Sequence, residues 1–261
     1  YYQDFKSKFI RKKNMKYNIE QIMSEHEYVH PNEMGGYLLH GGLDKDGKYI
    51  SPRTLIRWEA VESWKSALLD QGHSLIDGST DLLKYGNYPN ISQAKYLLNL
   101  SFGKFLWDSL TVTGVIEARG QALAEITAPD FQKIIVEDIS ETATAHMNSG
   151  LFKAHGFDEG GDPNSKKGAH DQMWFAARDL LFGKNAFPEP EIPESLARPQ
   201  DSAEMPQIPI EYEGIISLLM NVLMIEIRAE SFFSYTMELA SSPDVFKNNR
   251  VNANLASEMI S

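Results

Sequence analysis

Cysteine is absent from the 261-residue chain, so disulfides, iron–sulfur clusters, thiolate metal sites and a cysteine nucleophile are all excluded. Any metal must therefore be held by histidine and carboxylate side chains. Positive charge is also scarce, because 25 Lys and Arg face 36 Asp and Glu and leave a net charge of -11. A nucleic-acid partner is disfavoured, since its phosphates would be repelled rather than neutralised.

Long hydrophobic runs are missing as well. The longest apolar stretch runs from Ile215 to Ile225, is interrupted by Asn221 and ends at Glu226. It falls short of the roughly 20 apolar residues that a transmembrane helix needs. The first 16 residues form a basic arm without the apolar segment of a signal peptide. We therefore expect a cytoplasmic protein with no membrane partner.

Helical periodicity dominates, and sustained β-alternation is scarce apart from a hairpin-like Asp46-Gly47. The pattern predicts a helix that begins at Ser51-Pro52, followed by helices at 92–127, 129–155, 169–182 and 212–240, and a last one from Pro243. Half of the prolines, six of 12, lie between Pro188 and Pro209, which predicts a long extended crossover over about 184–211.

This order of elements predicts an all-α fold, a four-helix bundle with a long crossover connection and an N-terminal helical extension. We divide the chain into an irregular N-terminal segment (1–50), an N-terminal helix and connector (51–91), and a helical bundle with a single core (92–261).

Carboxylates interrupt the apolar stripes of these helices. In the predicted 212–240 helix, spacings of four and three place on one stripe Leu219, Leu223, Glu226, Glu230, Phe233 and Met237. A buried carboxylate without a partner costs several kcal/mol, so a cation should lie close to these glutamates.

Three other helices repeat the feature. Glu117 lies among the small residues Gly114, Ala118 and Gly120, which would let a helix or ligand approach closely. The predicted 129–155 helix places Glu141 and His146 along its inward edge, and Glu258 lies in the last helix. Glutamates that project inward from several helices, together with histidine, suit a dinuclear metal site in a bundle core.

On these residues the chain resembles the ferritin-like superfamily of di-metal carboxylate proteins, over roughly 92–261. The resemblance implies a ferritin-like bundle with two iron ions, or manganese in their place. Such a centre activates O2 to oxidise a small, largely apolar organic substrate. A second copy of the chain, in a homodimer, remains open as a partner. The metal ligands that the resemblance implies are Glu117, Glu141, His146, Glu226, Glu230 and Glu258.

The chain departs from the family's pattern in two places. The family has Glu-x-x-His, but His146 follows Glu141 by five residues, and a π-bulge would be needed to bring them together. Three residues after Glu258 stands Ser261 rather than histidine, so either the remaining ligands lie beyond this sequence or the ligand set is incomplete.

Two other classes of protein remain open. His26-Glu27-Tyr28-Val29-His30 has the form of a zinc hydrolase motif, with Glu59 or Glu62 as a third ligand, although Pro31 disfavours a helix at His30. A metal-free helical interaction or structural protein would instead pair its inward glutamates with cations such as Arg119 or Arg228.

A glycine-rich segment follows the predicted 129–155 helix. Its acidic residues Asp158, Glu159 and Asp162 could hold a cation, and His155 and His170 flank it. We interpret this segment as a solvated loop and the two histidines as surface residues.

Overall fold

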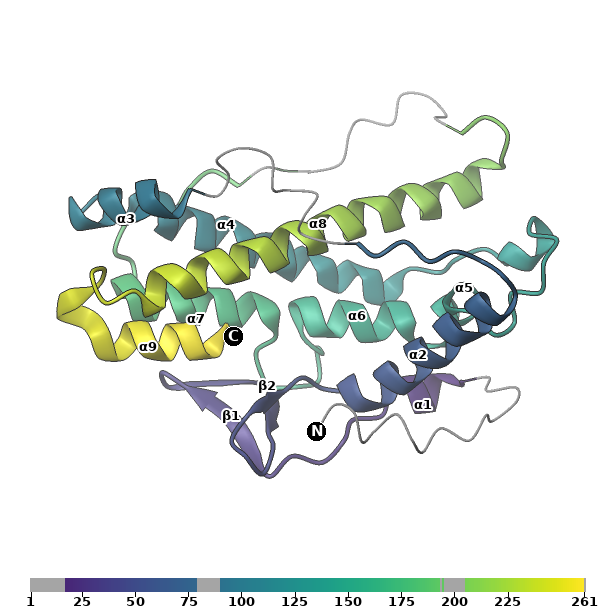
Figure 1. Cartoon of the computed structure of the whole chain (residues 1–261), viewed down its shortest axis with the longest axis horizontal. Coiled ribbons are helices and arrows are strands. Elements are labelled where there is room, and N and C mark those ends of the chain that lie inside the picture. Colours follow the sequence, from purple (N-terminus) through teal and green to yellow (C-terminus); the bar gives the residue numbers. More distant parts are fainter. Residues whose placement is uncertain (1–16, 79–89, 193, 195–204, 261) are drawn as a thin grey trace.

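The computed structural model describes residues 17–78, 90–192, 194 and 205–260, and these are mostly helical (Figure 1). The expectation of a mostly helical chain is thus confirmed, with the addition of a small three-stranded sheet. The basic arm at 1–16 and Ser261 lie outside the described residues. No helix in the described ranges is long and apolar enough to cross a membrane.

Five helices lie alongside one another: α4 (Lys104–Gly120), α6 (Leu151–Gly160), α7 (His170–Phe182), α8 (Ile210–Ser241) and α9 (Arg250–Met259). α4 packs against both α6 and α7, and α9 packs against both α7 and α8. Figure 1 shows α4 running from left to right and the chain returning leftward through α6 and then α7. α8 also runs leftward, and α9 turns back. Because α7 and α8 point the same way, the end of α7 and the start of α8 lie at opposite ends of the molecule.

The main core lies where α4, α7, α8 and α9 meet. Its fully buried residues include Leu106 and Leu110 of α4, Trp174 of α7 and Leu239 of α8. Burying a leucine of this kind contributes roughly 1.5–3 kcal/mol relative to leaving it exposed. The helices at 169–182 and 212–240 that the sequence predicts are confirmed as α7 and α8.

The predicted 92–127 helix is divided. It consists of α3 (Ile91–Asn99), α4 and the 3-10 helix η3 (Gln121–Glu125). The break lies between α3 and α4, where Ser101 adopts a φ of 64°. At Gly103 an added Cβ would lie 2.7 Å from the Phe182 ring, so a larger residue at this point would require the ring to shift.

The predicted 129–155 helix is wrong. The segment instead forms η4 (Phe131–Lys133), the single turn α5 (Ala143–His146), η5 (Met147–Ser149) and then α6. Side chains bind the backbone locally and compete with helical hydrogen bonds. Asp130 accepts from the Gln132 amide, and the Gln132 side chain donates to Ile135 O and Glu137 O. Gly150, with a φ of 107°, then separates η5 from α6.

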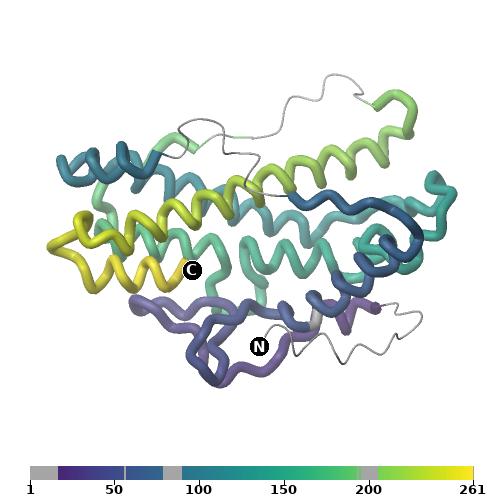
Figure 2. The backbone as a smooth tube through the Cα atoms, in the orientation of Figure 1, coloured from purple at the N-terminus to yellow at the C-terminus, as the bar shows by residue number. Residues whose placement is uncertain are grey.

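The N-terminal segment is also more regular than predicted. It contains α1 (Ile19–Met23) and the strands β1 (His30–Met34), β2 (Tyr37–Leu43) and β3 (Tyr49–Ile50), which pair antiparallel in this order. Figure 2 shows this part of the backbone on one side of the helices. The strands were missed because they are short and contain two glycines, Gly41 and Gly42, that weaken the alternation.

Two further elements complete the description. α2 (Thr54–Asp70) confirms the helix predicted after Ser51-Pro52, although it begins two residues later. The last helix does not begin at Pro243, because the chain first forms η6 (Lys247–Asn249) before α9. The Arg250 side chain donates to the carbonyl oxygens of Ala240, Ser242 and Val245, and so ties the start of α9 to the end of α8.

Candidate metal centre

Glycines bring α6 unusually close to α4 and η3. A Cβ at Gly160 would lie 2.6 Å from Ala118 O, and a Cβ at Gly156 would lie 2.6 Å from the Ala124 amide nitrogen. A Cβ at Gly120 would lie 2.7 Å from the Cβ of Glu159. The absence of side chains at these positions therefore lets the Glu159 carboxylate enter the space between the helices.

Five side chains converge at this contact and form what we call the carboxylate–histidine cluster: Glu117 of α4, His155 and Glu159 of α6, His170 of α7 and Glu226 of α8. Two overlapping groups of three lie within it. In the first, Glu117, Glu159 and His170 each place a ligand atom within 4.8 Å of the others. In the second, His155, Glu159 and Glu226 do the same. Glu159 belongs to both groups.

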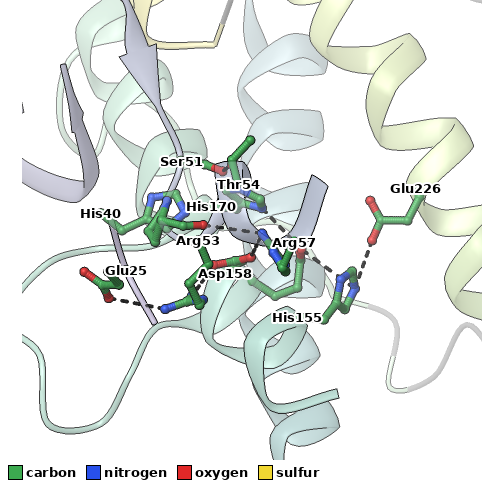
Figure 3. A network of polar contacts seen from close by, with 12 residues as sticks. Glu25, His40, Ser51, Arg53, Thr54, Arg57, His155, Asp158, His170 and Glu226 are labelled. Atoms are coloured by element: carbon green, nitrogen blue, oxygen red, sulfur yellow. Dashed lines mark hydrogen bonds and ion pairs between the residues drawn. The ribbon is translucent and has the colours of Figure 1, made fainter. Parts of the chain in front are cut away.

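The shortest contacts join a histidine to a carboxylate. His170 Nδ1 lies 3.2 Å from Glu159 Oε1, and His155 Nε2 lies 3.1 Å from Glu226 Oε1. The remaining contacts are longer, at 4.0 Å from His170 Nδ1 to Glu117 Oε2 and 3.9 Å from His155 Nε2 to Glu159 Oε1. Figure 3 shows the His155 ring turned toward Glu226 across the gap between α6 and α8.

The cluster is buried on one side and open on the other. The side chains of Glu117 and Glu159 are only 5% and 8% exposed. Those of His155, His170 and Glu226 are 31%, 28% and 46% exposed, respectively. The cluster is therefore partly exposed at His155, His170 and Glu226, while the two carboxylates of Glu117 and Glu159 lie on its buried side.

The buried carboxylates titrate as a pair. Burial, and next to it the neighbouring Glu159, raise the pKa of Glu117 well above its usual range. Burial alone would also raise the pKa of Glu159, but hydrogen bonds from His170 and Glu117 and the charges of both histidines outweigh it and lower that pKa. Without a cation, Glu117 therefore carries the proton and Glu159 carries the charge.

The pKa values of the two histidines shift in the opposite direction from the pKa of an ordinary buried imidazole. Burial lowers the pKa of His155 and of His170, but the hydrogen bonds and charges of Glu226 and Glu159 raise both pKa values above the usual range. The acidic groups of the cluster thus attract positive charge. Protons on the imidazole and carboxyl groups supply part of that charge.

The chemistry of the donor set fits divalent transition metals. Three carboxylates and two neutral imidazoles would carry a charge of about -3, which two divalent ions would balance to about +1. Carboxylate oxygen with imidazole nitrogen suits iron, manganese and zinc, and a carboxylate between two groups of donors is placed to bridge two ions. The residues present therefore fit a dinuclear metal centre.

A second polar network lies next to the cluster. Asp158, which precedes Glu159 in α6, accepts from Arg53 and from Arg57 Nη2, the latter at 2.6 Å. Arg53 also binds Glu25 at 3.2 Å (Figure 3). Asp158 and Arg53 are both 5% exposed in their side chains, so this ion pair is buried and joins α6 to the start of α2.

The structure brings together two of the six residues that the sequence assigned to the metal. Glu117 and Glu226 belong to the cluster. Glu230, one turn after Glu226, and Glu258 of α9 are exposed. Glu141 is partly exposed and precedes α5. In the described part of the chain these last three are in neither group of potential ligands.

His146 is buried away from the cluster, and both of its ring nitrogens are occupied. Its Nε2 accepts from the backbone amide of Tyr17 at 3.1 Å, and its Nδ1 lies 2.7 Å from Thr142 O. Its ring packs against Trp64, with centroids 4.7 Å apart. These partners make His146 a structural histidine, and the helix with a π-bulge that would pair it with Glu141 is not formed.

The zinc-like motif does not form the helix that its chemistry requires. His26 lies outside any helix or strand, and His30 begins β1. Two histidines place their rings on one face when they are one helical turn apart, and this geometry is absent at His26 and His30. Neither residue belongs to a group of potential metal ligands within the described ranges.

Three members of the cluster, His155, Glu159 and His170, were interpreted from the sequence as a loop and its flanks. The signal that would have found the first two is the spacing of four between His155 and Glu159, which places both on one helical face. The glycines on either side of Glu159 hid this signal, because they resemble a turn until their packing against α4 is known.

Comparison with family models, with curated proteins and with solved structures finds no match for this chain.

Proposed function

We propose that the chain is a ferritin-like di-metal carboxylate protein that binds two iron ions, or manganese, and catalyses the O2-dependent oxidation of a small organic substrate. The observation that carries this proposal is the position of Glu159, which belongs to both groups of potential ligands. A buried carboxylate between two histidine–carboxylate pairs is the arrangement that a bridged pair of ions requires.

The path of the chain supports the same proposal. α4 is followed by α6 and α7 in the opposite direction, a long connection leads to α8 in the direction of α7, and α9 returns (Figure 1). This order is expected of a bundle with one long crossover. Glu117 lies on the first of these helical rows, His155, Glu159 and His170 on the second, and Glu226 on the third.

Each side chain has a defined part in this proposal. Glu117 and His170 would hold one ion, His155 and Glu226 the other, and Glu159 would bridge the two. When bound, two iron ions would pass electrons to O2, and the organic substrate, as it is oxidised, would return them. Glu117 and Glu159 would hold the ions on the buried side of the site, and the partly exposed His155 and Glu226 on its outer side.

The surface of α8 next to Glu226, on the exposed side of the cluster, favours an apolar substrate. Leu223 lies three residues before Glu226 on α8, and Leu219 lies four residues before Leu223, so all three lie on the same helical face. Their exposed fractions are 44% and 39%, which is high for leucine. A small, largely apolar molecule that approaches Glu226 would bury these side chains as it binds.

Oxygen uptake tests this proposal. The chain is loaded with Fe²⁺ without oxygen, freed of unbound metal and mixed with O2 in an electrode chamber. We expect rapid uptake by the wild type and loss of at least nine-tenths of the rate in Glu159→Gln, because the variant lacks the bridging charge. Glu230→Gln, on the exposed face of α8, is the matched control and should keep the wild-type rate. A wild-type rate no faster than free Fe²⁺ would refute the proposal.

One observation favours a second function, that of a metal-free helical interaction or structural protein. Each histidine of the cluster already lies about 3 Å from a carboxylate, so protonated His155 and His170 partly compensate the acidic charge. In that case the histidine–carboxylate contacts of the cluster would hold α6, α7 and α8 together. Such a protein would bind no stoichiometric metal, whereas the di-metal protein would bind two ions in each chain.

A further inference from the structure

Trp174 lies one helical turn after His170 on α7 and is completely buried. Its indole is stacked on Phe233 of α8, with ring centroids 4.2 Å apart, and on Phe232, at 5.2 Å. These two rings fix the plane of the indole. The side chain therefore has a single orientation, on the same side of α7 as His170.

The indole N–H of Trp174 has no hydrogen-bond partner among the described residues. A buried donor without an acceptor costs about 1–3 kcal/mol. His170, one turn earlier on the same side of α7, places its Nδ1 4.0 Å from Glu117 Oε2, so the neighbouring acceptor for the Trp174 N–H is the Glu117 carboxyl. Burial raises the pKa of Glu117 most, and the Trp174 N–H acts on it in the opposite direction, as a hydrogen-bond donor does. The donor is thus turned toward the Glu117 carboxyl without reaching the geometry of a full hydrogen bond.

We propose that Trp174 is a positioning residue for Glu117, and that its N–H donates a hydrogen bond to this carboxylate once Glu117 ligates a cation. The inference rests on the proposed metal centre. Carboxylates that bind metal are themselves oriented by hydrogen bonds from surrounding groups. A fully charged carboxylate is also a stronger acceptor, so the unsatisfied N–H gains its partner when the ion binds.

Trp107 provides a matched control within the same chain. It is also completely buried, and its N–H also has no partner in the described residues. It lies on α4 ten residues before Glu117, about 15 Å along the helix, with the Arg178 guanidinium 4.8 Å from its ring. Replacing either tryptophan with phenylalanine removes the same volume and the same N–H.

The experiment is a titration with Zn²⁺, a diamagnetic ion that accepts nitrogen and oxygen ligands. It is followed by the indole ¹H–¹⁵N signals of the full chain, assigned by through-bond experiments. We expect the Trp174 indole proton to move downfield by about 1 ppm as Zn²⁺ binds, because charge-assisted hydrogen bonds are short and strong. The Trp107 signal should stay in place. Calorimetry should show that Trp174→Phe weakens Zn²⁺ binding roughly 10-fold or more, and Trp107→Phe less than twofold.

The possible outcomes separate this inference from the proposed function. If Zn²⁺ binds and the Trp174 signal does not move, Trp174 is not a donor to Glu117 and the metal centre still stands. If calorimetry detects no Zn²⁺ binding to the wild type, both proposals fail. The wild-type signals decide the matter even if Trp174→Phe does not fold.

Discussion

Asp158 and Glu159 are adjacent in α6, yet their carboxylates belong to separate networks. Asp158 is neutralised by Arg53 and Arg57, which approach from the start of α2, whereas Glu159 faces His155 and His170. Because the arginines are engaged by Asp158, the charge of Glu159 remains available to cations within the cluster. The ion pair also fixes the rotation of α6, and with it the direction in which Glu159 points.

Removing the charge of Asp158 should destabilise the protein. Asp158→Asn leaves the buried Arg53 guanidinium without its main partner, and breaking a buried pair from one side costs about 3–5 kcal/mol. The free energy of unfolding in urea should fall by about this amount. Asp108→Asn is the control, because Asp108 pairs with Lys104 on the surface and should contribute less than about 1 kcal/mol. Equal losses in the two variants would contradict a special role for the buried pair.

Replacing His146 should separate stability from metal binding. In His146→Phe the Tyr17 amide loses its acceptor and Thr142 O loses its donor, which should cost about 1–3 kcal/mol for each buried group left unsatisfied. The metal content should not change. His170→Phe should behave in the opposite way, with a small change in stability and a loss of bound metal. A loss of metal in His146→Phe that exceeds the loss in His170→Phe would overturn the assignment of ligands.

The two glutamates of α8 should differ in their effect on metal binding. Glu226→Gln removes a carboxylate that lies 3.1 Å from His155, so it should lower the number of bound ions from about two to about one. Glu230→Gln changes an exposed residue one turn away and should leave the number unchanged. Elemental analysis of both variants after the same anaerobic loading provides the measurement. Identical numbers for the two would show that Glu226 is not a ligand.

Metal binding should release protons. Burial and Glu159 raise the pKa of Glu117, so this carboxyl is protonated near neutral pH until a cation displaces the proton. Metal affinity should therefore fall as the pH is lowered, because protons compete with the ion for the same groups. Calorimetry in buffers with different ionisation enthalpies counts the protons released. Glu117→Gln should release about one fewer than the wild type, and an unchanged count would show that Glu117 does not carry this proton.

The sequence predicts those helices that bury one apolar face. It also predicts two of the acidic residues in the cluster. Glu117 and Glu226 were found because each interrupts an otherwise apolar stripe of a long helix. The assignment of Glu230 failed because the apolar stripe on α8 is wider than the buried surface, so a carboxylate on that stripe can still face water.

The other three members of the cluster depend on contacts that the sequence does not display. Gly156 and Gly160 resemble helix breakers, but in the structure they allow α6 to pack against Ala124 and Ala118. The pairing of Glu141 with His146 failed for a different reason, since local hydrogen bonds from Gln132 and its neighbours replace the predicted helix. Both errors arise where tertiary or local contacts outweigh helix periodicity.

The number of metal ions bound to the purified chain tests the central claim most directly. After anaerobic loading with Fe²⁺ and removal of free metal, elemental analysis should find about two ions for each wild-type chain, and at most one in Glu159→Gln. A wild-type chain that retains no stoichiometric metal would contradict the account, as would a Glu159→Gln variant that retains both ions.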